Sequence, residues 1–246
     1  MRVLLEGILW RFSGENRVSQ IFEYVNREIE GKCIKMTLRF SCCEEIEGEF
    51  FDLLSPDGKL VLFKSENGKG FLAGLSKAYF TSPSQFFEYL SIANQNRMNN
   101  RMELNIDIGN TNTFIVVTCM EFQEDGSQKS SKLTFVELDS SQRQAINRNV
   151  NLPNRRSESV ALSMVVAALH RRVTNPQTFI PYRDSKLTHL LKESLGGRDK
   201  ALFILNLRQL KHWEESLNAL RFGSRVTEVK NNPQKWIRVN SLPFHE

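Results

Sequence analysis

The segment from Ile180 to Gly197 constrains the fold of this chain more than any other stretch. It opens with a polar loop in which Asp184 and Ser185 can cap the helix that follows. The apolar side of that helix is formed by Leu187, Leu190, Leu191 and Leu195. Two closing glycines can supply the left-handed residue that ends it. Arg183 and Lys186 are then left pointing outward beside the cap, so the pattern predicts a rigid basic loop and a short helix packed onto a core.

Alternating strand and helix signals run along the rest of the chain. The dipeptide Asn67-Gly68 is the turn signal of a hairpin. The apolar run Ala201–Leu205 is typical of a buried strand, and we expect it to share one sheet with Lys132–Leu138. The other predicted strands are Val3–Trp10, Cys33–Cys42, Lys59–Lys64, Gly70–Leu75 and Thr113–Met120, and the predicted helices are 18–29, Pro83–Asn94, Glu158–Arg172 and one that begins near Glu215. This alternation predicts a layered α/β fold around a largely buried sheet.

Several of these segments resemble the kinesin motor domain, and they follow one another in the family's order. The motif from Ile180 to Thr188 is similar to the loop and helix that face the microtubule in that family, and Phe51–Pro56 is similar to one of its strand ends. Residues 215–225 resemble its last helix. The resemblance implies a kinesin-like three-layer α/β fold, with a mixed central β-sheet and helices on both faces, that lacks the family's first strands. It also implies a partial motor-like domain over 1–230 and a tail over 231–246 similar to the start of a neck linker.

The net charge of +5 is distributed unevenly along the chain. Residues 1–142 carry 15 Lys and Arg against 20 Asp and Glu, a balance of −5, whereas residues 143–230 carry 16 against 7, a balance of +9; the tail adds +1. A basic half on an otherwise acidic domain indicates an acidic partner. We expect neither nucleic acid nor a membrane as partner, because the sequence has no recognition motif and no membrane-spanning apolar run. The four cysteines have no metal-ligand spacing and suit a reducing cytoplasm.

The loop after the first predicted strand is the place where the resemblance puts a phosphate-binding loop. Such a loop needs glycines, followed by Lys and then Ser or Thr. Here Ser13, Gly14, Glu15 and Asn16 occupy that place, with Glu15 at the position of the lysine and Asn16 at that of the magnesium-binding hydroxyl. A carboxylate at the lysine position repels a triphosphate. The resemblance therefore implies a degenerate nucleotide site.

Both segments that sense the γ-phosphate in the family also depart from its pattern. In the first segment, Gly109 and Asn110 stand where the family has serines and an arginine. In the second segment, the family's Asp-Leu-Ala-Gly-Ser-Glu becomes residues 137–142, with Glu137 first, Ser140 in place of the glycine and Gln142 in place of the last glutamate. We therefore predict no catalytic residue, no metal and no cofactor. ATP and Mg²⁺ would be bound only if the chain belonged to an active motor.

The basic half retains the charges through which the resemblance implies tubulin binding. Arg171 and Arg172 close a predicted helix, where cations also interact favourably with the helix dipole. Lys64 and Lys69 on the hairpin could add a second, weaker contact. The predicted microtubule-binding residues are Arg143, Arg148, Arg155, Arg156, Arg171, Arg172, Arg183, Lys186, Lys64 and Lys69.

Three functions agree with this sequence. The first is a non-catalytic microtubule-binding domain that acts in microtubule-based processes with a motor partner, such as a catalytic kinesin in a heterodimer. The second is a fragment of an active ATP-dependent kinesin whose phosphate-binding loop lies outside this chain. The third is an interaction domain that no longer binds tubulin. The first interpretation predicts a protein located on the microtubule cytoskeleton of the cytoplasm.

Overall fold

The computed structural model describes residues 35–55, 57–58, 60–103, 111–122, 127–138, 158–205 and 213–233. Within these residues, seven strands form one sheet in the order β4-β3-β2-β1-β6-β7, with β5 paired to β1. The strands are β1 (Lys35–Ile46), β2 (Glu49–Asp52), β3 (Leu60–Glu66), β4 (Lys69–Ala73), β5 (Ala78–Phe80), β6 (Thr111–Phe122) and β7 (Gln128–Glu137). Every pairing among them is antiparallel. The predicted strand Val3–Trp10 and helix 18–29 lie outside the described residues.

The predicted hairpin around Asn67-Gly68 is confirmed. These two residues have φ angles of 50° and 73°, the left-handed values that a two-residue turn between twisted strands requires. The strands on either side pair from Glu66↔Lys69 to Leu62↔Ala73. Asparagine and glycine tolerate this backbone region better than other residues, so the local sequence alone determines the turn.

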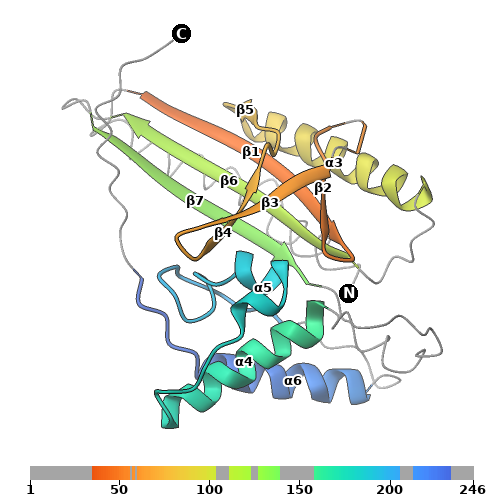
Figure 1. Cartoon of the computed structure of the whole chain (residues 1–246). Helices are drawn as coiled ribbons and strands as arrows, with labels where there is room; N and C mark the ends of the chain where they lie inside the picture. Colours follow the sequence, from red (N-terminus) through yellow and green to blue (C-terminus); the bar gives the residue numbers. More distant parts are fainter. Residues whose placement is uncertain are drawn as a thin grey trace.

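The two faces of the sheet are covered by different helices (Figure 1), and the side chains on each face belong to a different layer of the core. One face packs against the helix α3 (Pro83–Glu103), which extends nine residues beyond the predicted end at Asn94. Its core consists of Leu38, Phe40, Cys42, Leu53, Phe80, Phe86, Ala93 and Ile115. Because strand residues alternate between faces, every second residue of β1 enters this layer.

The opposite face packs against helices from the C-terminal half of the chain (Figure 1). The short helix α5 (Lys186–Leu190) inserts Leu187 beside Cys43, Phe50, Val61 and Phe114 of the sheet. A third cluster joins α5 to the helices α4 (Glu158–Thr174) and α6 (Trp213–Thr227). Helices therefore lie on both faces, as predicted. None of the described helices is long and apolar enough to cross a membrane.

The helix after the basic loop begins at the predicted cap but is shorter than predicted, because it ends at Leu190 and is followed by turns before the two glycines. The hydroxyl oxygen of Ser185 accepts a hydrogen bond from the backbone N–H of Thr188 at 2.9 Å, so Ser185 is the N-cap of α5. Gly196 has a φ of 79°, and a Cβ atom there would lie 2.8 Å from the Leu169 side chain. Glycine at position 196 thus lets the chain turn directly against α4.

The predicted buried strand Ala201–Leu205 is wrong. These residues follow no strand path, and Leu202 is 80% exposed. Only Phe203 among them packs against a core cluster. An apolar run becomes a strand only where a neighbouring strand supplies hydrogen bonds, and none of the described strands pairs with this segment.

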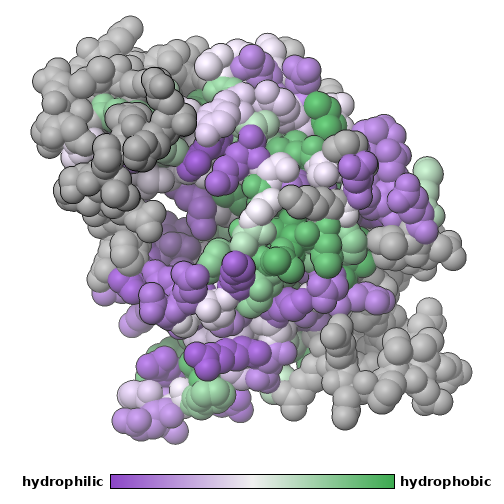
Figure 2. Space-filling model, turned by 45° about the horizontal axis from the view of Figure 1, so that its top comes forward, coloured by the Kyte–Doolittle hydropathy of each residue, from purple (hydrophilic) through white to green (hydrophobic). Residues whose placement is uncertain are grey.

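The outer face of the β3–β4 hairpin carries apolar side chains that no described element covers. Leu60, Leu62 and Phe71 are exposed, with Leu62 at 61%. Figure 2 shows apolar side chains gathered over this part of the molecule. The inner face of the same hairpin packs on the core through Val61, Phe63 and Leu72.

Candidate functional site

Three of the predicted microtubule-binding arginines lie on two elements of the described chain that contact each other. Arg171 and Arg172 are exposed in the last turn of α4, and Arg183 is exposed in a short 3-10 turn, Tyr182–Asp184. The helix and the turn are in contact. Burial raises the pKa of Tyr182, and the positive charge of Arg172 partly offsets this. None of the three arginines forms an ion pair with another described residue.

The turn that presents Arg183 is fixed by hydrogen bonds on both sides. The hydroxyl group of Thr188 donates to the carbonyl of Tyr182 at 2.8 Å, and the hydroxyl group of Tyr182 donates to the carbonyl of Leu195. The ammonium of Lys192 lies 5.8 Å from the centre of the Tyr182 ring. Arg183 is therefore held on a preformed loop and needs little ordering to bind a partner.

The predicted lysines differ from these arginines because two of them already have acidic partners. The ammonium of Lys186 lies 2.9 Å from a carboxylate oxygen of Glu49, and that of Lys69 lies 3.5 Å from Glu193. Lys64 is exposed on β3. A lysine that is already paired with a carboxylate attracts a second acidic group less strongly. Arg143, Arg148, Arg155 and Arg156 lie outside the described residues.

Of the predicted nucleotide-site positions, Glu137 alone belongs to the described residues. Ser13, Gly14, Glu15, Asn16, Gly109, Asn110, Ser140 and Gln142 all lie outside them. Glu137 is the last residue of β7, and its Oε2 lies 3.1 Å from a terminal guanidinium nitrogen of Arg97 on α3. Burial raises the pKa of Glu137, while Arg97 partly offsets this.

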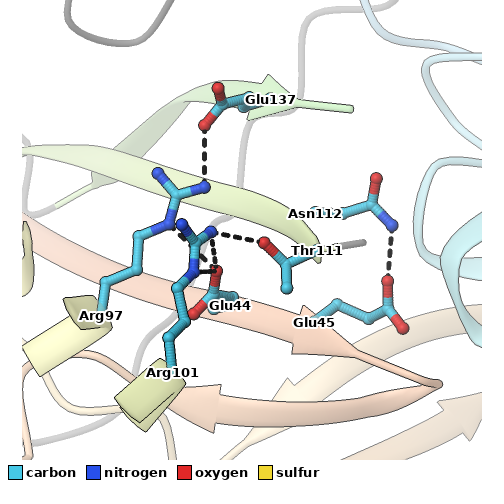
Figure 3. A network of polar contacts seen from close by, with 7 residues as sticks. All are labelled: Glu44, Glu45, Arg97, Arg101, Thr111, Asn112 and Glu137. Atoms are coloured by element: carbon cyan, nitrogen blue, oxygen red, sulfur yellow. Dashed lines mark hydrogen bonds and ion pairs between the residues drawn. The ribbon is translucent and has the colours of Figure 1, made fainter. Parts of the chain in front are cut away.

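Arg97 and Glu137 are part of a larger buried network of charges (Figure 3). Glu44 on β1 is completely buried, and its Oε1 accepts hydrogen bonds from Arg97 Nε at 3.0 Å and Arg101 Nε at 3.1 Å. Arg101 also donates to the hydroxyl oxygen of Thr111, the first residue of β6, at 2.6 Å. Two arginines from α3 thus connect three neighbouring strands.

Sheet register explains why these groups meet. Glu44 is the direct partner of Thr113, and Thr113 is the direct partner of Glu137, so the two carboxylates lie in one row across β1, β6 and β7. Directly paired residues project to the same face. That face is the one covered by α3, from which the side chains of Arg97 and Arg101 extend toward the sheet (Figure 3).

Sequence reasoning missed Glu44 and Arg101. A usable signal was present, because Glu44 continues the alternation of Leu38, Phe40 and Cys42 toward the core. A carboxylate at an inward position requires a cation, and Arg97 and Arg101 are one helical turn apart. The pairing between the two segments spans 53 and 57 residues and could not be read from local sequence.

No group of three or more His, Cys, Asp or Glu side chains in the described part of the chain could hold a metal ion. Glu137 directs its carboxylate at a guanidinium, and Glu44 lies between two. A carboxylate neutralised by arginine is a weak ligand for Mg²⁺. The network connects the strands β1, β6 and β7 to the helix α3.

The family model, the curated relatives and the solved structure that match this chain are all kinesins. The family model of the kinesin motor domain matches residues 8–229. The chain is 26% identical over 217 residues to "Kinesin-related protein 5" of Dictyostelium discoideum, an alignment that covers 86% of this chain and 22% of that protein. It is 31% identical over 206 residues to the "Kinesin heavy chain" of Gibberella moniliformis, covering 80% of this chain and 22% of that protein.

One solved structure is described as "Structure of a fast kinesin: Implications for ATPase mechanism and interactions with microtubules". It matches with a TM-score of 0.76 at 26% identity, covering 93% of this chain and 66% of that chain. A sheet with helices on both faces defines a three-layer α/β domain of the motor type. Since the family model covers most of its length, the chain belongs to the kinesin motor domain family. It spans about a fifth of the length of the two curated relatives.

Proposed function

We propose that this chain is a kinesin-family domain that binds microtubules without binding or hydrolysing ATP. The observation that carries the binding half is the group of exposed arginines, Arg171, Arg172 and Arg183, at the end of α4 and on the adjoining fixed turn. Tubulin has an acidic surface, and exposed arginines that have no ion-pair partner among the described residues are complementary to it. The fast kinesin of known structure is itself described in terms of interactions with microtubules.

The non-catalytic half of the proposal is supported by residues at three separate positions. Glu15 stands where a phosphate-binding lysine is expected, and Gln142 stands where the second sensor has its glutamate. Glu137, at the start of that sensor, is paired with Arg97 inside the protein. Phosphoryl transfer depends on positive charge and a metal around the phosphates, and these substitutions work against both. In the cytoplasm such a domain would add a microtubule contact to a catalytic kinesin partner in a heterodimer.

The second candidate is a fragment of an active, ATP-dependent kinesin motor. This candidate is favoured by how little of the known kinesins the chain spans. It covers 66% of the solved kinesin chain and 22% of each of the two relatives. ATP and Mg²⁺ would then be held by residues outside this chain. The third candidate is an interaction domain without tubulin binding. No particular feature of the described residues favours it.

Co-sedimentation with microtubules tests the binding half. The double variant Arg171→Ala/Arg183→Ala removes two unpaired cations and should weaken binding by roughly fivefold to tenfold at low salt. The matched control Lys129→Ala/Lys132→Ala removes two exposed cations from β7 and should bind as the wild type does. Equal loss in both double variants would mean that binding follows overall charge and that the arginine cluster is not the tubulin site.

A further inference from the structure

Two oxygen atoms of the buried charge network and its surroundings have no hydrogen-bond partner among the described residues. Glu44 accepts hydrogen bonds from Arg97 and Arg101 through its Oε1, whereas its Oε2 is buried and unpartnered. The hydroxyl oxygen of Thr113 on β6 is also buried and unpartnered, and the residue as a whole is 3% exposed. Buried polar atoms in native proteins nearly always have a partner, so these two atoms require an explanation.

The sheet register places the two side chains next to each other. Glu44 and Thr113 are direct partners of β1 and β6. The Cβ atoms of direct partners in an antiparallel pair lie about 4.5–5.5 Å apart, and the two side chains project to the same face. The hydroxyl group of Thr113 nevertheless forms no hydrogen bond with the carboxylate beside it. One small molecule between the two side chains could therefore satisfy both atoms at once.

The charges around this position determine which molecule fits. Two carboxylates, those of Glu44 and Glu137, are paired with the two guanidinium groups of Arg97 and Arg101, so the network is electrically balanced (Figure 3). An additional cation or anion would leave an uncompensated charge in the interior, which is costly. A neutral molecule that donates to a carboxylate oxygen and accepts from a hydroxyl group has no such cost. Buried water fits this description, because it typically forms about three hydrogen bonds to polar groups that are otherwise unsatisfied.

We propose that an internal water molecule binds between β1 and β6, on the face covered by α3, and bridges Glu44 Oε2 and Thr113 Oγ1. The water donates one hydrogen to the carboxylate and accepts the hydroxyl hydrogen of Thr113. Both oxygens of Glu44 then have partners, the guanidinium groups at one and the water at the other. The water is thus part of the connection between α3 and the sheet, and Thr113 is a positioning residue for Glu44.

Thermal unfolding of the Thr113→Val variant tests the bridge, because the sign of the change depends on the water. Valine has nearly the same shape as threonine and is also β-branched. If the hydroxyl group binds a water, its loss leaves the water and Glu44 with fewer partners, and Tm should fall by roughly 3–8 °C. If the hydroxyl group has no partner, its replacement by a methyl group removes an unsatisfied polar group from the core, and Tm should rise.

The matched control for this substitution is Thr118→Val. Thr118 lies on the same strand but projects to the opposite face, and its exposure is intermediate. Thr118→Val should change Tm by no more than about 2 °C. An unchanged or higher Tm in Thr113→Val, or an equal decrease in the two variants, would overturn the bridging water.

Nuclear Overhauser effects between water and protein protons detect the bound water itself. The wild type should show a cross-peak between a long-lived water and the methyl protons of Thr113, and the Thr113→Val variant should lose the cross-peak to residue 113. A lower Tm in Thr113→Val without this cross-peak in the wild type would indicate a direct hydrogen bond between Thr113 and Glu44, and would also overturn the proposal. Both measurements use the protein alone, so neither depends on microtubule binding.

Discussion

Replacing Glu44 by Gln should destabilise the protein more than any other single charge change in the described chain. The carboxylate is fully buried and accepts hydrogen bonds from both Arg97 and Arg101. After the change, Arg97 retains Glu137, but Arg101 retains only the hydroxyl group of Thr111 among the contacts of the network. A buried guanidinium without a carboxylate has lost most of the interaction that compensated its removal from water.

The expected loss in the free energy of unfolding depends on how deeply Arg97 and Arg101 are buried. The side chains of Arg97 and Arg101 are 16% and 10% exposed, so water can replace the lost carboxylate only in part. Breaking a buried ion pair by removal of one partner costs about 3–5 kcal/mol. For a domain of this size, each kcal/mol lowers Tm by roughly 2–4 °C, so the expected decrease is of the order of 10 °C.

Thermal and urea unfolding of Glu44→Gln measure this effect directly. Glu66→Gln, on the exposed end of β3, is the control and should change the free energy of unfolding by no more than about 0.5 kcal/mol. A double variant that also carries Arg101→Gln should recover part of the loss, because the unpaired charge is then removed as well. The reasoning is refuted if Glu44→Gln unfolds at the same temperature as the control.

Two further predictions concern other carboxylates. Burial raises the pKa of Glu137 above its ordinary value, so the folded state binds its proton more readily than the unfolded state, and the wild type should gain stability as pH falls through the folded pKa. Glu137→Gln should remove this part of the pH dependence in urea unfolding curves, and identical curves for the two proteins would contradict it. Glu49→Gln releases Lys186 from its ion pair and should tighten microtubule binding by roughly twofold to fivefold at low salt. Unchanged or weaker binding would show that Lys186 does not contribute to the tubulin contact.

Local chemistry made parts of this fold predictable from sequence. The turn at Asn67-Gly68 and the cap at Ser185 depend on residues within three positions of each other, and both formed as predicted. The helices α3 and α4 were placed correctly at their starts but extend beyond their predicted ends. Helix ends depend on caps and on packing as well as on apolar spacing, which explains the difference.

Parts of the fold that depend on distant partners could not be predicted. Ala201–Leu205 has the composition of a buried strand, yet no described strand pairs with it and Leu202 is exposed. The same limit applies to the candidate site. The sequence predicted Lys186 as a free cation, but Glu49 neutralises it from 137 positions away. Arg171, Arg172 and Arg183 were predicted correctly as exposed charges because a helix end and a turn project them locally.

The affinity of this protein for microtubules in different nucleotide states tests the central claim most directly. Purified protein would be sedimented with microtubules after apyrase treatment and in the presence of ADP, ATP or a non-hydrolysable ATP analogue, at one salt concentration. The account predicts measurable binding with the same Kd in all four conditions and no phosphate release above that of microtubules alone. A nucleotide-dependent change of about fivefold or more, the scale of ordinary allosteric coupling, would contradict it. Microtubule-stimulated ATP hydrolysis would contradict it equally.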